Sequence, residues 1–406
     1  MVSNLNKQLK DFKERFIEGI LMVSGTVTTV AVLLIIIFLF KEGVSLFGKS
    51  PLENNISILV NEKNPLTAIT AAQIKDISDQ KITNWKQIGG ADDSIILVTI
   101  NELSTYYTDD QLGDNLQFVP DKVNELVGKT PGILGLFSTK NLGDKYTHKY
   151  LSIKDITIGS FLFGKQWFPT ATPAAQMGIL PLILGTLWVS FGAILFALPI
   201  GIAAAIYLAE IAGKRMRNTI KPIIELLSGI PSVVFGFFGL VVIVPIIQKL
   251  FHLDVGETGL AGSIVLAIMA LPTIITVSED AMRTTPRLMK EASLALGATQ
   301  WQTIVRVIIP YSFSGISAAA ILGIGRAIGE TMAVIFVTGS ANVIPHTLLQ
   351  PMHTIPAVIA AELGEVSQGG RHYKALFALG CVLFIMTFIV NLIVQYIFSK
   401  RKHNQV

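Results

Sequence analysis

The stretch that decides the fold runs from Arg283 to Pro310 and reads RTTPRLMKEASLALGATQWQTIVRVIIP. It is amphipathic and lies between two apolar runs, Gly259–Ser278 and Tyr311–Val337. Its apolar residues recur near the helical period, and Gly297 favours a break between two short helices. The stretch therefore predicts a helix–glycine–helix element between membrane spans. It is either a docking surface for another protein or an ordinary cytoplasmic loop.

The same stretch resembles the EAA loop of ABC importer permeases. Glu291-Ala292-Ser293 is followed by three residues and Gly297, and after nine more residues the chain reads Val307-Ile308-Ile309-Pro310. Ser293 replaces the second alanine of the family pattern. In that family the loop is the coupling helix, which docks into a cleft on a cytoplasmic ATPase. The resemblance implies six ATPase-coupling residues: Arg287, Glu291, Ala292, Ser293, Gly297 and Pro310.

The composition is that of a membrane protein. Apolar residues make up 51% of the chain and charged residues 15%, and the mean hydropathy is +0.58, beyond what a soluble globule of this length shows. The single cysteine, Cys381, rules out an internal disulfide and a cysteine metal cluster. The net charge of +4 is small, and we expect no nucleic-acid partner and no bound metal.

Six runs are long and apolar enough to cross a bilayer. They are Ile20–Phe40, Ile179–Leu208, Leu226–Ile247, Gly259–Ser278, Tyr311–Val337 and Ala375–Phe398. We interpret the first as a retained anchor rather than a signal peptide, because it is too long and no cleavage site follows promptly. Basic residues gather in alternate loops, near 7–15, 214–221, 283–306 and 400–402. The positive-inside rule then places both termini and the central loop in the cytoplasm.

The sequence thus predicts an all-α polytopic membrane protein of the ABC importer permease (MetI-like) type, with an extracytoplasmic α/β insert between the first and second spans. Its parts are a cytoplasmic N-terminus (1–19), an anchor (20–40), the insert (41–165), a five-span core (178–399) with the coupling loop (280–310), and a basic cytoplasmic tail (400–406). Within the insert we expect strands at Ile56–Val60, Ile95–Ile100 and Ile133–Phe137, and helices at Ala71–Ile77 and Asp121–Val127.

The insert resembles part of one lobe of phosphate-binding receptor proteins. The runs that carry this resemblance are KITNWK at 81–86 and PGILG at 131–135. The Ser-Gly-Thr segment with which such receptors hold the anion is absent, because the chain after Ile100 reads Asn101-Glu102-Leu103. The other lobe is absent too, and a two-lobed clamp cannot close with one lobe. We therefore expect the insert to stabilise the protein, to dock a receptor, or to be a relic, without phosphate ligands.

From Gly164 onward the chain resembles phosphate importer permeases of the PstC type. The runs SGIPSVVFGFFG at 228–239 and GIGRAIGETMA at 323–333 match the third and fifth spans of that family. The insert and Thr331-Met332-Ala333 favour this type over the related PstA type. The resemblance implies a subunit in a bacterial inner membrane that pairs with a PstA-type permease, a PstB-type ATPase dimer and a PstS-type receptor to import phosphate. Another oxyanion as substrate, and a permease homodimer, remain open.

The first candidate for the pathway is the run Ser228-Gly229-Ile230-Pro231-Ser232. Glycine and proline make a regular helix hard to keep there, and irregular backbone at membrane depth is tolerated where it lines a polar path. The N–H groups freed by such a break can face an anion. The alternative is a simple proline kink with close helix packing at Gly236 and Gly239.

The second candidate is the pair of charges inside the fifth span, Arg326 and Glu330. Four residues apart on a helix, they would share a face and could pair. Each costs about 2.5–3.5 kcal/mol in lipid, so this face should look into protein or water. The planar guanidinium suits a phosphate oxygen, with Glu330 holding Arg326 in place. The alternative is a structural pair that fixes helix register. The expected pathway residues are Arg326, Glu330, Thr331, Ser228, Gly229, Pro231 and Ser232.

Catalytic motifs are absent from the sequence. It contains no Walker A run, no H-E-x-x-H and no G-x-S-x-G, so we expect no enzyme activity and no cofactor in this chain, with ATP and Mg bound by the partner ATPase. His346, His353 and His372 lack metal-ligand spacing and are expected in solvent, and Trp167 and Trp188 at the membrane interface. A membrane sensor that binds a ligand through the insert is the alternative from another functional class.

Overall fold

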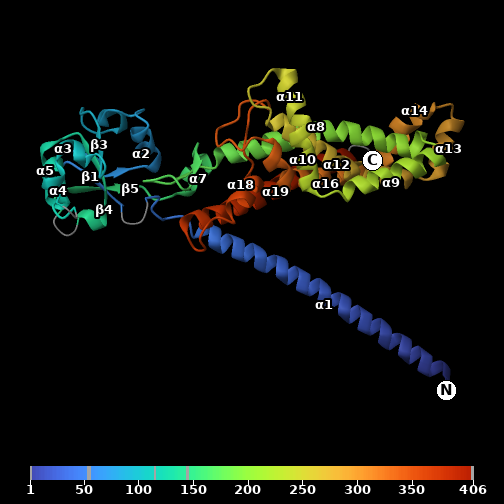
Figure 1. Cartoon of the computed structure of the whole chain (residues 1–406). Helices are drawn as coiled ribbons and strands as arrows, with labels where there is room; N and C mark the ends of the chain where they lie inside the picture. The colour runs from blue at the N-terminus through green and yellow to red at the C-terminus, as the bar shows by residue number, and fades with distance from the viewer. Residues whose placement is uncertain (1, 53–55, 114–115, 143–145, 404–406) are drawn as a thin grey trace.

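A computed structural model describes residues 2–52, 56–113, 116–142 and 146–403, excluding the side chains of 2–14 and 397–403. Figure 1 shows an elongated molecule with an α/β domain at one end and a helical bundle at the other. A short neck joins them, and helix α1 (Val2–Val44) leaves the bundle at this neck and points away from it. The insert is thus a separate lobe at one end of the bundle.

The predicted spans are present in the described part of the chain, five as apolar helical spans and one as a bent pair. The five are α1, α8 (Leu180–Ile206), the run α10 (Ser232–Phe238), η4 (Gly239–Ile243) and α11 (Val244–Phe251), then α12 (Gly259–Arg283) and α19 (Arg371–His403). The bent pair joins Gln300–Tyr311 to α16 (Phe313–Gly329) at 71°. The membrane part of the fold is therefore all-α and polytopic, as predicted.

Two span boundaries were predicted wrongly. The third span begins at Ser232 rather than Leu226, because the chain leaves the helix between Ser228 and Pro231. Leu226 belongs instead to α9 (Lys214–Ser228), an amphipathic helix with no buried residue. The fifth predicted span is not one helix to Val337: α16 ends at Gly329 and a short helix, α17 (Met332–Val337), follows. In both places glycine weakens the helix where the chain breaks.

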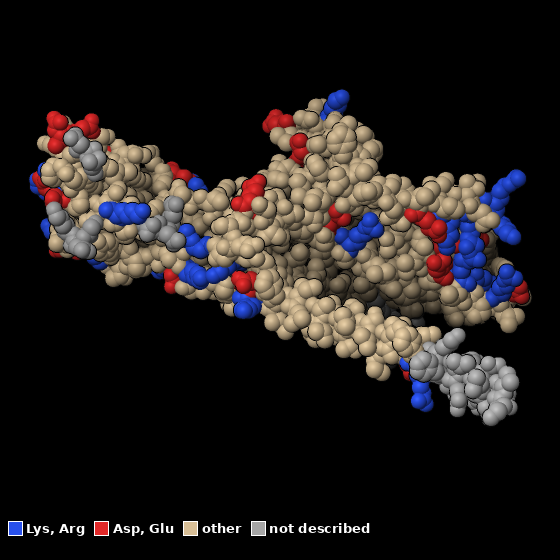
Figure 2. All heavy atoms as spheres, turned by 60° about the horizontal axis from the view of Figure 1, so that its bottom comes forward, with Lys and Arg blue, Asp and Glu red and all other residues tan. Residues whose placement is uncertain are grey.

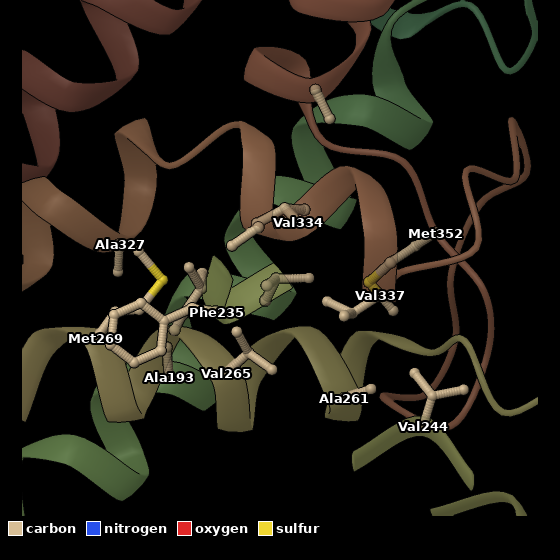
Figure 3. Close-up of a cluster of buried hydrophobic side chains, with 14 of the residues drawn as sticks. Ala193, Phe235, Val244, Ala261, Val265, Met269, Ala327, Val334, Val337 and Met352 are labelled. Atoms are coloured by element: carbon tan, nitrogen blue, oxygen red, sulfur yellow. The ribbon is translucent and has the colours of Figure 1, made fainter. Parts of the chain in front are cut away.

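The core of the bundle lies where α12 packs between α8, α10, α16 and α17. Figure 3 shows Phe235 beside Met269, with Val265 and Val334 in the same cluster. Close helix approach requires glycine here: a Cβ at Gly239 would meet the side chains of Val265 and Val337 at 2.6 and 2.7 Å. Two interpretations of the third span were open, a helix break or close packing at its glycines, and the structure contains both.

The insert contains a five-stranded sheet in the order β2-β5-β1-β4-β3. The strands are β1 (Ile56–Val60), β2 (Ala68–Ile69), β3 (Ile96–Thr99), β4 (Ile133–Ser138) and β5 (Lys149–Ile153). The helices are α2 (Ala71–Ser78), α3 (Leu103–Tyr106), α4 (Asp109–Leu112), α5 (Val119–Lys129) and α6 (Thr139–Leu142), with the 3-10 turn η1 (Trp85–Ile88). Each predicted strand and helix is present within two residues of its expected ends.

A buried tryptophan explains the two receptor-like runs of the insert. Trp85, from the first run, is 1% exposed, and its indole N–H donates to the Gly132 carbonyl in the second run at 2.9 Å. Trp85 packs with Ile58 and Leu134 in one hydrophobic cluster of the insert, while Leu59 and Phe137 belong to a second cluster. The two runs are therefore held together as parts of one structural core.

The structure of the neck region shows that three side chains are not where the sequence predicted them. It comprises α7 (Ile158–Phe163), β6 (Trp167–Phe168) and β7 (Gln176–Met177), beside α18 (Ile355–Glu362). Trp167 is not at the membrane interface: it is 0% exposed and its indole N–H donates to Glu362 Oε1 at 3.1 Å. His372 is not in solvent, because its Nε2 lies 2.6 Å from Glu362 Oε2. His353 is also buried and pairs with Asn342, whereas His346 is exposed as predicted.

Candidate functional site

The predicted helix–glycine–helix element is present at one end of the bundle. Helix α13 (Arg287–Ala295) is followed by Gly297 in the left-handed conformation, φ +84°, and Thr299 then caps α14 (Gln300–Thr303). Leu288 and Leu296 are 78% and 89% exposed. Apolar side chains presented this far on a polar loop are typical of an interaction surface rather than of a plain connecting loop.

The structure divides the six expected coupling residues into two groups. Arg287, Glu291, Ala292 and Gly297 are exposed. Ser293 is only partly exposed, and its hydroxyl lies 2.9 Å from that of Thr303, so it closes the element on itself. Pro310 is partly buried in α15 (Ile309–Tyr311), where it ends the loop.

An ion pair that the sequence did not reveal ties the loop to the end of α8. Lys290 Nζ lies 2.6 Å from Glu210 Oε1, and the two side chains are only 22% and 10% exposed. Glu210 belongs to η3 (Tyr207–Ile211), a π-helical turn that extends α8. The Gln300 amide also donates to the Glu210 carbonyl at 3.1 Å. These contacts hold the loop directly against the end of a membrane span.

A second ionic cluster holds α9 against the same end of α12. The Glu279 carboxylate is 1% exposed and lies 2.9 Å from Arg217 Nε and 2.7 Å from Lys221 Nζ, with Arg283 at 3.5 Å. Burial opposes the charge of Lys221, but the carboxylates of Asp280 and Glu279 outweigh it and raise the pKa of the Lys221 amine. Glu279 at the end of an apolar run, four residues before Arg283, was the signal that could have indicated this cluster.

Reversing the charge of Lys290 tests the link between loop and span. Lys290→Glu is expected to remove about 1.5–3 kcal/mol of charged hydrogen bonding and, in the ATP-driven transport that the resemblance to the EAA loop implies, to lower uptake per ATP hydrolysed. Adding Glu210→Lys should restore much of the coupling, because the pair re-forms with opposite polarity. Lys214→Glu, an exposed site at the same end, is the matched control. Normal coupling in Lys290→Glu alone would refute the link.

The two expected pathway segments lie next to each other as two interrupted helices. The first interruption separates α9 from α10 at Gly229 to Pro231, and the second separates α16 from α17. Helix α10 packs along α17, since a Cβ at Gly236 would lie 2.8 Å from Ala333 Cα. Paired discontinuous helices at membrane depth expose backbone groups that can serve an ionic substrate.

The predicted ion pair between Arg326 and Glu330 is wrong for this chain. Helix α16 stops at Gly329, and Glu330 is extended with ψ 136°, so the two residues do not share a helix face. No ion pair within 4.0 Å joins them in the described part of the chain. Glu330 Oε1 lies instead 3.5 Å from the Ala333 N–H, at the start of α17. A carboxylate that approaches the backbone N–H groups of a new helix favours such a break.

Arg326 is left half-buried, and the described part of the chain gives it neither a hydrogen bond nor an ion pair. Its helix face is open: a Cβ at Gly325 or Gly329 would meet no atom within 4 Å. Close helix approach is therefore not made at these two glycines within the described part of the chain. It is made at Gly323, whose Cβ would meet the side chain of Ile274. A hollow of 460 Å³ adjoins the break, lined by Gly329 and Thr331 among others.

Comparison with known proteins identifies a matching family, similar sequences and a similar structure. Residues 197–403 match the family described as "Binding-protein-dependent transport system inner membrane component". The "Probable ABC transporter permease protein YqgH" of Bacillus subtilis is 40% identical over 261 residues, 64% of this chain and 84% of that protein. The "Phosphate transport system permease protein PstC" of Mesorhizobium japonicum is 38% identical over 260 residues, 59% of this chain and 78% of that protein. A chain of the MetNI methionine ABC transporter aligns at 19% identity with a TM-score of 0.44, covering 55% of this chain and 95% of that chain.

Proposed function

This chain belongs to the binding-protein-dependent transport system inner membrane component family, and on that premise we propose that it is the permease subunit of an ATP-driven phosphate importer. It is a multi-pass ABC importer permease, of a family whose members are not themselves enzymes and work with a separate ATPase and a substrate-binding protein. The observation that carries phosphate as the substrate is the 38% identity to a PstC protein over 78% of that protein's length.

Arg326 is the residue we assign to the anion. It is a half-buried guanidinium without a partner in the described part of its own chain, beside two interrupted helices. A guanidinium presents a planar fork of donors that matches phosphate oxygens. Thr331 and the Ser228–Ser232 break, including Gly229 and Pro231, line the same region in this proposal. Glu330 acts there by organising the start of α17 rather than by holding Arg326.

In this proposal two exposed surfaces and the end of the bundle that carries the insert are assigned to three partners. A homologous permease of the PstA type covers the open face at Gly325 and Gly329, and a PstB-type ATPase dimer, which binds ATP and Mg, docks under α13. A PstS-type receptor delivers phosphate at the end where the insert lies. ATP-driven closure of the ATPase pair moves α13, and the Lys290–Glu210 contact passes this movement to α8, so that the pathway opens in turn to each side.

The orientation is inferred from charge. Figure 2 shows Lys and Arg gathered at the end of the bundle opposite the insert, over α9 and α13. The positive-inside rule makes this end cytoplasmic. Both termini then lie in the cytoplasm and the insert lies outside it.

Uptake measurements test the substrate. The chain is co-reconstituted in vesicles with its second permease, ATPase and receptor, and uptake of labelled phosphate is compared with that of sulfate. We expect ATP-dependent uptake of phosphate and little of sulfate. Uptake of sulfate with no uptake of phosphate would support the importer function but refute phosphate as its substrate.

The insert is proposed to bind no phosphate of its own. At the end of β3, where a receptor's anion segment would follow, the Glu102 carboxylate accepts the Thr99 N–H at 2.6 Å. A carboxylate already occupies this backbone donor, and its charge repels an anion. Calorimetry on a fragment of residues 51–156 is expected to detect no saturable phosphate binding. Tight binding there would revive the sensor alternative.

A further inference from the structure

An apolar groove of 460 Å³ lies between the spans α1, α8 and α19. Its lining includes Val44 of α1, Ile183 of α8, and Val382 and Ile385 of α19. No charged, amide or hydroxyl side chain of the described residues lines it. Helices α1 and α19 meet at Gly43, where a Cβ would lie 3.0 Å from Ala378 Cα, and α1 then diverges from the bundle (Figure 1).

Two lysines lie at the end of this groove nearest the insert. Lys374 is on α19, four residues before the groove residue Ala378, so both lie on the same helix face. Lys49 follows α1, and its segment is fixed to the start of α19 because the Arg371 guanidinium donates to the Ser50 carbonyl at 3.0 Å. Contact with the Lys374 amine lowers the pKa of Lys49.

This arrangement is unfavourable for the protein alone. Neither lysine has a carboxylate within 4.0 Å among the described residues, and two neighbouring cations repel each other unless an anion lies between them. Inorganic phosphate would neutralise the lysines but has no apolar part that could fill the groove. A neutral lipid would fill the groove but carries no net negative charge that could neutralise the lysines. The ligand that fits both features carries an anionic headgroup and an acyl chain.

We propose that the groove binds an anionic phospholipid, with an acyl chain along α19 and the phosphate between Lys49 and Lys374. The groove-lining part of α19 runs from Ala378 to Val390, about 18 Å at 1.5 Å per residue. One leaflet of the hydrocarbon core is about 15 Å deep, so an acyl chain matches this length. The lipid joins α1 to the bundle, which matters because the membrane-crossing part of α1 is otherwise 0% buried.

Native mass spectrometry of the detergent-purified full chain tests the proposal, with phosphatidylglycerol and phosphatidylcholine as probes. Phosphatidylglycerol is expected to bind more tightly than phosphatidylcholine and to resist displacement by inorganic phosphate. Lys49→Gln with Lys374→Gln should weaken phosphatidylglycerol binding roughly 30-fold, because two lysines near a lipid phosphate are lost, and should weaken phosphatidylcholine binding much less, because its choline cation offsets the phosphate charge. Lys249→Gln, an exposed lysine of α11 away from the groove, is the charge control.

The groove itself is tested by Ile385→Trp, which fills it and is expected to weaken binding of both lipids. Leu392→Trp, on an exposed part of α19 outside the groove lining, is the matched control. Equal affinity of the native chain for the two lipids would overturn the proposal, and this comparison needs no variant to fold. Unchanged phosphatidylglycerol binding in the double lysine variant, or its displacement by inorganic phosphate, would overturn it as well.

Discussion

Membranes that carry Gly297→Trp are expected to assemble the transporter and yet lose uptake by about 30-fold or more. Gly297 has φ +84°, a conformation that costs L side chains about 1–2 kcal/mol, and a Cβ there would point into open space. The indole would thus project from the tip of the helix–glycine–helix element, beside the exposed Leu296. Residues at the centre of an interface contribute about 2 kcal/mol or more, and we expect an obstruction at the centre of the proposed docking surface to cost as much.

The matched variant is Gly297→Asn, because asparagine tolerates the left-handed conformation and is small. We expect it to keep most of the coupling. The measurement is labelled phosphate uptake and ATP hydrolysis in the same vesicles, normalised to assembled complex. Hydrolysis that continues without uptake in the tryptophan variant would identify uncoupling. Uptake at the native rate in Gly297→Trp would remove the docking role from this loop.

Substitution of Arg326 is expected to have the other large effect. Arg326→Gln removes a charged hydrogen-bond donor from the proposed pathway, about 1.5–3 kcal/mol, which lowers phosphate uptake by about 10- to 150-fold. Arg326→Lys keeps the charge but loses the planar fork, so uptake should fall by less than with glutamine. Insertion of the spans should survive, because no internal ion pair of the described residues depends on this guanidinium.

The double variant Arg326→Gln with Glu330→Gln separates transport from scaffolding. A pair that only fixed helix register would tolerate loss of both charges, whereas a pathway residue would not. Because the two residues are not paired in this chain, we expect the double variant to transport as poorly as Arg326→Gln alone. Glu330→Gln alone should have the smaller effect, at the start of α17. Normal uptake by the double variant would move the pathway to the Ser228–Ser232 break.

The sequence by itself determined the features that depend on neighbouring residues. The length of the apolar runs located the spans, and the local pattern of apolar residues located the strands of the insert, such as β1 at Ile56–Val60. Glycine chemistry located the turn at Gly297, and glycine with proline located the break before Ser232. The spacing around Glu291 indicated the family. Each of these features depends on residues that are close together in the sequence, so the sequence alone is sufficient to predict them.

The tertiary structure alone decided which polar groups meet. Lys290 and Glu210 are 80 residues apart, and Trp167 and Glu362 are 195 apart, so no local period could connect them. Arg326 and Glu330 show the opposite case. Their helical spacing predicted an ion pair, but the helix ends at Gly329 and the ion pair does not form. Burial of a polar group is favourable only with a partner, and that partner comes from packing between elements, which helical spacing in one segment does not encode.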